Sequence, residues 1–224
     1  MAGVHQLDHP LVRAELSKLR NSERHETGIK IEIVAKPFSG HRPHRSHARS
    51  RGFQGVGGTN ISRRNPVAAF EGTTIKPRIG LTPILRAGLG MTDALLTLFP
   101  SAPVYHLGLF REKVTLQPVE YYSKLPPFPP VDIVYLLDPL IATGGTAVAA
   151  LGMIVDWGIP AEKIKLLCVL ASEKGLNNVQ TLFPELEAGC RKVYSGVDEV
   201  LTKEGIISPG LGDTGDRLFN TIRP

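Results

Sequence analysis

The sequence predicts an α/β fold with a largely parallel sheet, because short hydrophobic runs alternate with helix-like stretches after about residue 76. Continuous runs of this kind are typical of strands that helices cover on both faces. The chain has 224 residues, 42% of them hydrophobic, which is enough for one large core or two small ones and excludes a disordered or fibrous protein. The expected strands are Ile79–Leu85, Val104–Leu109, Ile133–Leu137 and Ile164–Leu170, and the expected helices are Met91–Phe99, Thr146–Trp157 and Leu176–Phe183.

The region before these elements divides into a helix-like stretch and a basic stretch. Residues 8–20 place Leu11, Leu16 and Leu19 on one stripe of a helix that begins after Asp8. Residues 41–65 are rich in Arg, His, Ser, Gly and Pro without hydrophobic periodicity, so they cannot bury enough surface to offset the entropy of ordering. We therefore expect a first helix followed by a loop or a disordered segment.

The basic charge is concentrated in one segment. No acidic residue occurs between Glu32 and Glu71, whereas seven Lys and Arg do, which exceeds the net charge of +5. The rest of the chain is therefore slightly acidic, and we do not expect nucleic acid as a partner. The three histidines within residues 41–47 have a proline among them and no nearby acid or cysteine, so no closed metal site is expected there.

Composition also indicates the compartment. No run approaches the roughly 18 uncharged apolar residues of a membrane span, and His5, Asp8 and His9 stand where a signal peptide would need an apolar stretch. Two cysteines are too few for a disulfide framework or a structural zinc site, and Cys168 lies in a hydrophobic run that places it in the core. We expect a cytoplasmic protein with no membrane partner.

A strand, a loop of small residues and a helix follow one another between residues 131 and 157. The strand ends at Asp138, where open α/β sheets bind ligands. Free N–H groups at the helix start and the hydroxyls of Thr143 and Thr146 suit a phosphate, and Gly144 and Gly145 let the backbone approach it. An ordinary tight turn with a threonine cap is the alternative. A Walker loop is excluded because no lysine follows the second glycine.

A second glycine-rich loop lies near the C-terminus. Gly210 to Gly215 has the spacing G-x-G-x-x-G, but a dinucleotide site would need a following βαβ unit of about thirty residues. Only nine residues follow Gly215, so nicotinamide binding is excluded. Exposed backbone N–H and C=O groups in such a loop match the donor and acceptor edge of a nucleobase, whereas a flexible C-terminal loop is the plainer alternative.

Four segments together resemble the uracil phosphoribosyltransferases. The loop after the third strand has a single acid, Asp138, followed by Pro139, as in these enzymes, whereas the wider phosphoribosyltransferase family usually has two adjacent acids. The resemblance extends from about Asn65 to Ile222, and residues 8–20 are similar to the family's N-terminal helix. The four segments are residues 83–91, 120–125, 131–147 and 208–217.

The resemblance implies a fold and a reaction. The fold is a phosphoribosyltransferase-like parallel sheet flanked by helices, with a small hood or flap region, in a single domain over residues 1–224. The reaction transfers the 5-phosphoribosyl group of phosphoribosyl diphosphate (PRPP) to uracil, giving UMP and diphosphate. Magnesium is carried by PRPP rather than by direct protein ligands. The family forms homo-oligomers, dimers or tetramers, and some members are activated by GTP, which makes GTP a candidate activator.

The resemblance also implies the site residues. Two arginines at strand ends suit a diphosphate because a guanidinium makes planar, charge-assisted contacts and keeps its charge. The residues implied as catalytic are Arg86, Arg111, Asp138 and Asp213; those implied for PRPP are Arg86, Arg111, Asp138, Pro139, Leu140, Ile141, Ala142, Thr143, Gly144, Gly145, Thr146 and Asp213; those implied for uracil are Ile207, Gly212, Asp213 and Thr214; and those implied for the flap are Tyr121 and Tyr122.

One segment departs from the family. Residues 26–64 replace the family's helices and strand at about the same length, so we expect them to be atypical and irregular. The pattern indicates a reading-frame slip or a mispredicted splice, and a genuine divergent segment is the alternative. The basic segment is also the sole support for a rival function, a non-catalytic PRPP-sensing or RNA-binding regulator on the same fold.

Overall fold

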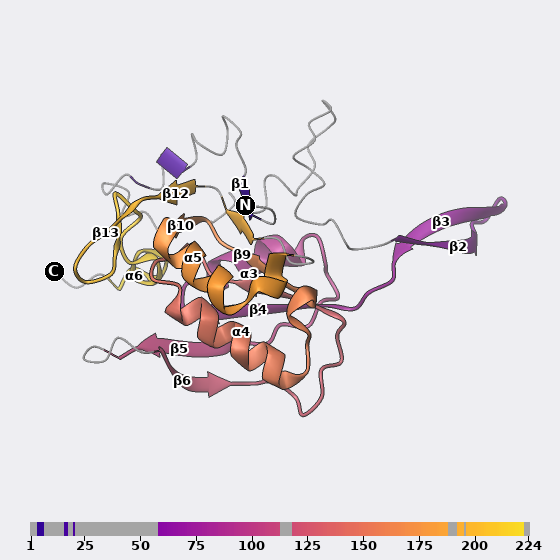
Figure 1. Ribbon diagram of the computed structural model, residues 1–224. Coiled ribbons are helices and arrows are strands. Elements are labelled where there is room, and N and C mark those ends of the chain that lie inside the picture. The colour runs from indigo at the N-terminus through magenta and orange to yellow at the C-terminus, as the bar shows by residue number, and fades with distance from the viewer. Residues whose placement is uncertain are drawn as a thin grey trace.

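The computed structural model describes residues 4–6, 16–17, 20, 58–112, 118–187, 192–194 and 196–221. A seven-stranded sheet forms its centre, in the order β1-β11-β9-β7-β4-β5-β6 (Figure 1). Neighbouring strands pair in parallel, apart from the antiparallel edge pair β5 and β6. The parallel sheet expected from the sequence is therefore confirmed. The strands are β1 (Val4–Gln6), β4 (Ile79–Leu85), β5 (Leu107–Arg111), β6 (Pro118–Ser123), β7 (Ile133–Leu137), β9 (Ile164–Leu167) and β11 (Lys192–Tyr194).

Three smaller sheets accompany the central one. Parallel strands form the order β12-β10-β8, and two antiparallel pairs are β13 with β14 and β2 with β3. Their bounds are β2 (Gly58–Arg64), β3 (Ala69–Ile75), β8 (Leu140–Ile141), β10 (Leu170–Ser172), β12 (Gly196–Asp198), β13 (Val200–Leu201) and β14 (Ile207–Ser208).

Helices cover both faces of the central sheet (Figure 1). Of the first helix expected from the sequence, the structure describes Leu16, Ser17 and Arg20, and all three are helical. No helix of the described residues is long and apolar enough to cross a membrane. The helices are α3 (Leu89–Leu96), α4 (Gly145–Trp157), α5 (Glu173–Leu182) and α6 (Thr214–Phe219), with 3-10 turns η2 (Ala161–Lys163) and η3 (Pro184–Glu187).

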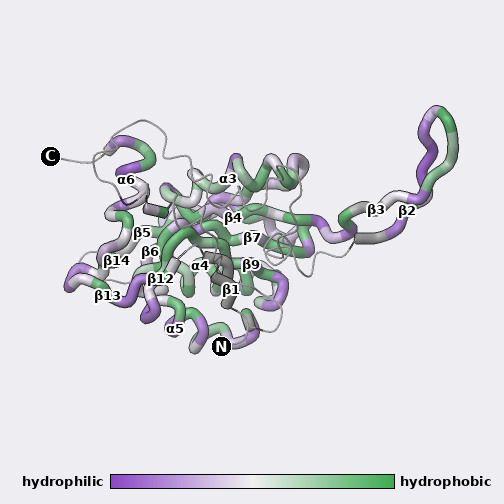
Figure 2. The backbone as a smooth tube through the Cα atoms, turned by 90° about the horizontal axis from the view of Figure 1, so that it is seen from above, coloured by the Kyte–Doolittle hydropathy of each residue, from purple (hydrophilic) through white to green (hydrophobic). Residues whose placement is uncertain are grey.

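The central strand β7 explains why the sequence runs are continuously hydrophobic. Val134 and Leu136 pack in one cluster with α4 and α5, whereas Tyr135 and Leu137 pack in a second cluster with α3. All five residues of β7 are buried. Figure 2 shows the same property as hydrophobic colour along β4 and β7. Because successive side chains alternate between the faces, a strand covered on both sides requires a hydrophobic residue at every position.

The chain leaves the two central strands in opposite directions. From β4 it continues through α3 to β5 on one side, and from β7 through α4 to β9 on the other side. Adjacent strands with diverging connections leave a crevice at their carboxyl ends, which is the usual ligand site of open α/β sheets. The residues that follow Leu85 and Leu137 therefore lie where a ligand is expected to bind.

Two expected strands differ in the structure. The run Val104–Leu109 becomes strand only from Leu107, and Val104 makes a single bridge to Leu81. The run Ile164–Leu170 is divided into β9 and β10, because the N–H groups of Val169 and Leu170 both donate to the Pro139 carbonyl at 3.0 Å. Cys168 lies in the core as expected, with 2% of its surface exposed.

The prediction of an irregular segment over residues 26–64 is wrong for residues 58–64, which form β2. This strand pairs along its whole length with β3 in a hairpin that projects from the body (Figure 1). At the turn, the Asn65 side chain accepts hydrogen bonds from the N–H groups of Val67 and Ala68. An Asn-Pro turn and backbone pairing form this hairpin without a hydrophobic stripe. Residues 26–57, including the histidine cluster, lie outside the described residues.

Two glycines of α4 give opposite predictions for stability. Gly158 ends the helix at φ +113°, whereas Gly152 lies inside it with no atom within 4 Å of an added Cβ. Gly158→Ala is expected to destabilise the protein by about 1–2 kcal/mol, because a side chain is strained at positive φ. Gly152→Ala is expected to stabilise it by up to about 1 kcal/mol. Urea unfolding measures both, and a stabilising Gly158→Ala would contradict the prediction.

Candidate active site

Arg86 and Asp138 are the first residues after β4 and β7, respectively, and these two strands are paired. The register joins Pro83 to Leu137, so both strands reach the same edge of the sheet. The loop after β4 lies against the end of β7: a Cβ added to Gly88 would stand 2.5 Å from the Leu137 carbonyl oxygen. A side chain at this position would separate the two strand ends. The glycine therefore permits the loop that carries Arg86 to lie beside Asp138.

Asp138 is a buried acid with little compensation for its charge. Only 9% of its surface is exposed, and one carboxylate oxygen accepts a long hydrogen bond of 3.4 Å from the Leu140 N–H. Burial raises the pKa of Asp138 to about 7, against the smaller lowering effect of that hydrogen bond. A ligand that donates hydrogen bonds to this carboxylate would favour its charged form.

The loop after Asp138 ends at the N-terminus of α4, as the sequence predicts. The helix begins at Gly145, and its N-cap Gly144 has φ +82° and no side-chain capping bond. The first bond of α4 runs from the Val148 N–H to the Gly144 carbonyl, so the N–H groups before it have no partner within the helix. The alternative of a threonine cap is therefore wrong. Uncapped N–H groups at a helix start attract an anion.

Helix α5 supports this loop from behind. Ser172 caps α5 by accepting from the Gly175 N–H at 2.9 Å and donates its hydroxyl proton to the Ala142 carbonyl. Asn178 donates to the Thr143 carbonyl at 3.0 Å. A Cβ on Gly175 would collide with the Ala142 carbonyl oxygen. Ser172, Gly175 and Asn178 were not among the residues expected from the sequence, although a serine just before a helix is a capping signal.

The second glycine-rich loop begins after β14. Gly210 donates its N–H to Asp198 at 3.0 Å, and the other oxygen of Asp198 pairs with Arg20 at 2.7 Å. Arg217 donates to the Leu211 carbonyl at 2.7 Å. These contacts attach the loop to β12 and to the first helix. Asp198 was not expected from the sequence, because its partner Arg20 lies 178 residues away along the chain.

The four residues expected at the base site divide into two kinds. Ile207 and Thr214 are buried at 4% and 6% exposure, and Ile207 packs in the core with α3. Gly212, with φ +68°, and Asp213 are exposed. The buried hydroxyl of Thr214 has no hydrogen-bond partner within the described chain. Ile207 therefore offers backbone groups, whereas Thr214 also offers a hydroxyl.

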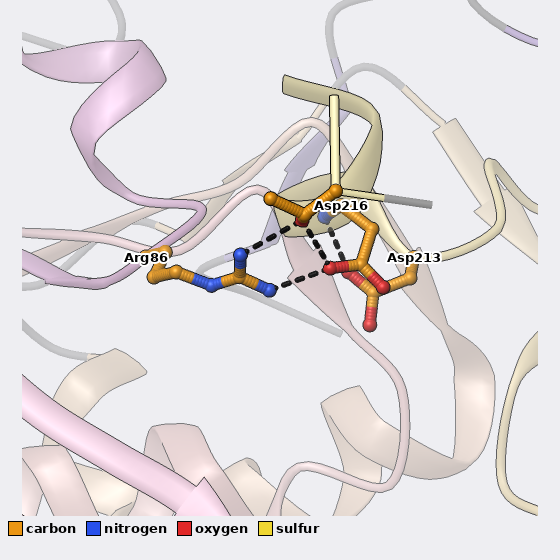
Figure 3. A network of polar contacts seen from close by, with 4 residues as sticks. Arg86, Asp213 and Asp216 are labelled. Atoms are coloured by element: carbon orange, nitrogen blue, oxygen red, sulfur yellow. Dashed lines mark hydrogen bonds and ion pairs between the residues drawn. The ribbon is translucent and has the colours of Figure 1, made fainter. Parts of the chain in front are cut away.

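The C-terminal helix α6 brings one acid, Asp216, into contact with Arg86. Arg86 pairs with Asp216 at 2.6 Å and donates to the Thr221 hydroxyl at 2.9 Å. Asp213 caps the same helix by accepting from the Asp216 N–H at 2.9 Å. Figure 3 shows the Arg86 guanidinium directed at the Asp216 carboxylate. The structure thus joins the loop after β4 to the loop after β14.

The remaining expected residues lie on the ribbon of β5 and β6. Arg111 is the last residue of β5, and its side chain is outside the described part of the structure. Tyr121 and Tyr122 of β6 are 55% and 41% exposed and flank Gly108 of β5. Within the described residues, no hydrogen bond joins these tyrosines to the loop between Asp138 and α4. The structure therefore brings Arg86, Asp138 and the loop together, whereas the tyrosines lie on an exposed edge.

A parallel sheet with an uncapped helix start after an acid-tipped central strand is the arrangement expected of the phosphoribosyltransferase class. The family model for uracil phosphoribosyltransferase matches residues 52–221. The chain belongs to the uracil phosphoribosyltransferase family. Its fold also resembles the solved structure of the AQ2163 protein from Aquifex aeolicus, with a TM-score of 0.76, 29% identity, and coverage of 96% of this chain and 97% of that chain.

Curated relatives agree with this assignment. A uracil phosphoribosyltransferase from Roseiflexus castenholzii is 49% identical over 156 residues, 70% of this chain and 72% of its own length. One from Desulfitobacterium hafniense is 40% identical over 227 residues, 99% of this chain and all of its own length. The family match begins at residue 52, before the position near Asn65 at which the sequence analysis placed its start.

Asp138 gives a prediction about stability and pH. Because its pKa is raised from 3.8 to about 7, the native state binds more protons than the unfolded state in this interval. Its contribution to stability is present below the lower value and is lost as the pH rises through the upper one. Asp138→Asn should match the parent near pH 4 and be more stable near pH 8, by an amount on the order of 4 kcal/mol at most.

Asp132→Asn is the matched control. The side-chain hydrogen bond from Arg78 lowers the pKa of Asp132, so this contribution has the opposite sign and is lost only in acid. Urea unfolding at both pH values measures the two variants. Equal pH dependence of the parent and Asp138→Asn would show that Asp138 titrates normally in the folded protein.

Proposed function

We propose that this chain transfers the 5-phosphoribosyl group of PRPP to uracil, giving UMP and diphosphate. The observation that carries the proposal is the uncapped start of α4 beside Asp138 and Arg86, at the carboxyl ends of two adjacent parallel strands. Membership of the uracil phosphoribosyltransferase family supports the same reaction. Nothing in the described residues favours a PRPP-sensing or RNA-binding regulator.

The 5′-phosphate is assigned to the loop from Ala142 to Thr146. The N–H groups at the start of α4 and the hydroxyls of Thr143 and Thr146 supply donors, and Gly144 and Gly145 add no side chain. Neither hydroxyl makes a hydrogen bond to another described residue. The backbone of Pro139, Leu140 and Ile141 leads the chain from Asp138 to this loop. A phosphate bound there would gain from several donors and from the helix dipole.

Asp138 is assigned to the ribose hydroxyls of PRPP. Hydroxyl donors would replace the hydrogen bonds that burial denies this carboxylate and would lower its pKa from about 7. Substrate binding and ionisation of Asp138 are therefore coupled. The short path from β7 to α4 keeps Asp138 close to the loop assigned to the 5′-phosphate, as a ribose that carries this phosphate requires.

Arg86 and Arg111 are assigned to the diphosphate group, on which negative charge develops as the ribosyl bond breaks. Magnesium bound to PRPP supplies further charge neutralisation of the leaving group. Within the described residues no three His, Cys, Asp or Glu side chains converge on a metal site. An ion here would take most of its oxygen ligands from phosphate and water, which is the common arrangement for magnesium.

Uracil is assigned to the loop that contains Ile207, Gly212, Asp213 and Thr214. Backbone groups of this loop and the unpartnered Thr214 hydroxyl provide the donors and acceptors that a pyrimidine edge requires. In the reaction, the bond from ribose C1 to diphosphate breaks and a ring nitrogen of uracil bonds to C1 with loss of its proton. The protein contributes mainly by holding the reactants in line and by stabilising charge.

The ribbon of β5 and β6 is assigned as the flap, with Tyr121 and Tyr122 closing over the site to exclude water. The proposal includes a homo-oligomer, dimer or tetramer. The projecting hairpin of β2 and β3 supports it, because Val67, Phe70 and Ile75 are 90%, 45% and 51% exposed there. GTP as an activator and a cytoplasmic location remain predictions.

One assay tests the proposed reaction. Purified protein is incubated with PRPP and magnesium, and diphosphate release is measured with and without uracil. Uracil-dependent release together with formation of UMP is the expected result. Release without uracil, or none with it, would contradict the proposal. Cytosine and hypoxanthine serve as control bases.

The two arginines give a kinetic prediction. Arg86→Ala or Arg111→Ala should lower turnover by about a hundredfold, as the loss of one oxyanion donor does in other enzymes. The reason is that each guanidinium stabilises charge that is largest in the transition state. Arg78→Ala, which removes an exposed arginine of another surface pair, is the control. Turnover within about twofold of the parent would remove the arginine from the mechanism.

Gly212 gives a prediction for the base. At φ +68° a branched side chain is strained, so Gly212→Val should distort the loop and raise the KM for uracil much more than the KM for PRPP. Steady-state kinetics with each substrate varied in turn measures this difference. An unchanged KM for uracil would place the base elsewhere.

A further inference from the structure

We propose that Asp216 is a positioning residue for Arg86, and that it holds the guanidinium ready for the diphosphate group with the help of Thr221. The inference rests on the proposed role of Arg86 as a diphosphate ligand. It adds two residues that the sequence motifs did not assign. Asp216 and Thr221 belong to the C-terminal segment, more than a hundred residues from Arg86 along the chain.

Three contacts form a closed triangle. Nη2 of Arg86 donates to Oδ1 of Asp216 at 2.6 Å, and Nη1 donates to Oγ1 of Thr221 at 2.9 Å. The Thr221 hydroxyl donates in turn to Oδ1 of Asp216 at 2.6 Å. Because two different nitrogens are held, both the position and the plane of the guanidinium are set. Figure 3 shows Arg86 reaching toward α6 from the opposite loop.

The guanidinium retains capacity for a ligand. An arginine has more N–H donors than these two contacts use, and their fork geometry suits phosphate oxygens. The backbone of Gly215 also lies close: a Cβ there would be 3.6 Å from Nη2 and 3.8 Å from Nε of Arg86. A Cβ at these distances would be in ordinary van der Waals contact, so the start of α6 lies directly beside the guanidinium.

Exposure indicates that the pair serves function more than stability. The side chains of Arg86 and Asp216 are 49% and 35% exposed, and ion pairs this accessible contribute little to folding. A free arginine side chain must lose rotamer entropy when it binds an anion. Holding Arg86 in place before PRPP arrives removes part of that cost, which is the general benefit of preorganisation.

The triangle also connects the two substrate loops. Asp216 lies in the first turn of α6 and donates its N–H to Asp213, which is the N-cap of that helix and a residue of the proposed base loop. The same short helix therefore fixes the base loop and the arginine of the diphosphate group. We therefore expect Asp216 to affect the binding of PRPP, and to do so through Arg86.

The alternative role for Asp216 is that of an inhibitor. The two roles predict opposite changes in the affinity for PRPP when Asp216 is removed. If the carboxylate merely competed with diphosphate for Arg86, its removal would strengthen PRPP binding by removing a negative charge. If it positions Arg86, its removal weakens PRPP binding although the site becomes more positive. The sign of the change in KM for PRPP therefore separates the two roles.

The test compares Asp216→Asn with Asp132→Asn. Asp132 forms a similar exposed pair with Arg78 at 2.9 Å, at the opposite ends of β4 and β7. The Asp132 side chain is 45% exposed and the Arg78 side chain 65%. Asp216→Asn should lower kcat/KM for PRPP by about tenfold, through a higher KM for PRPP together with a lower kcat, while KM for uracil changes by less than about twofold. Asp132→Asn should keep the parent's kinetics.

A double variant separates positioning from a general structural effect. In an Arg86→Ala background, Asp216→Asn should have no further effect on kcat/KM, because the residue that it positions is gone. Thr221→Val, which keeps the shape and removes the hydroxyl, should cause a loss of about threefold in the presence of Arg86 and none in its absence. This variant also keeps the test valid if Asp216→Asn does not fold.

The activities of the single and double variants distinguish failure of the positioning role from failure of the proposed function. Parental activity in Arg86→Ala would overturn the proposed role of Arg86 itself. Low activity in Arg86→Ala with parental activity in Asp216→Asn would overturn the positioning role alone and leave the proposed function intact. A lower KM for PRPP in Asp216→Asn, or an equal loss in both backgrounds, would also overturn it.

Discussion

The parallel pairing of β4 with β7 is the constraint on which the site depends. Five register pairs, from Ile79 with Ile133 to Pro83 with Leu137, hold these strands together. Their burial on both faces makes this pairing costly to shift, because a slip by one residue would exchange the side chains of the two faces. Their ends therefore stay side by side, and the loops that carry Arg86 and Asp138 begin from a fixed edge.

Close backbone contact is the second property of the site. Glycines stand where the loop after β4 meets β7 and where α5 meets the phosphate loop, and a Cβ on Gly88 or Gly175 would collide with a carbonyl oxygen. Contacts of this kind leave the loop little freedom to move, so binding a phosphate requires little reorganisation. The buried Asp138, with its pKa raised to about 7, is the cost of placing an acid on so well covered an edge.

The C-terminal segment completes the site through both core packing and polar contacts. Helix α6 has six residues, is capped by Asp213 and packs Leu218 against the core cluster that contains Leu211. Such a short helix gains little from its own hydrogen bonds. Its order therefore depends on the elements around it, which suits the proposed role of this segment in base binding.

The sequence by itself determined the elements whose signals are local. Strands β4 and β7 have the expected bounds, and the phosphate loop at the start of α4 was expected from an apolar strand followed by Thr-Gly-Gly-Thr. Only the tertiary structure decided the division of β9 from β10, the hairpin of β2 and β3, and the contact of Arg86 with Asp216. Hydrophobic periodicity is a property of neighbouring residues and can be read from the sequence. The hydrogen bond between Arg86 and Asp216 joins residues 130 positions apart, so it depends on how all the intervening chain folds.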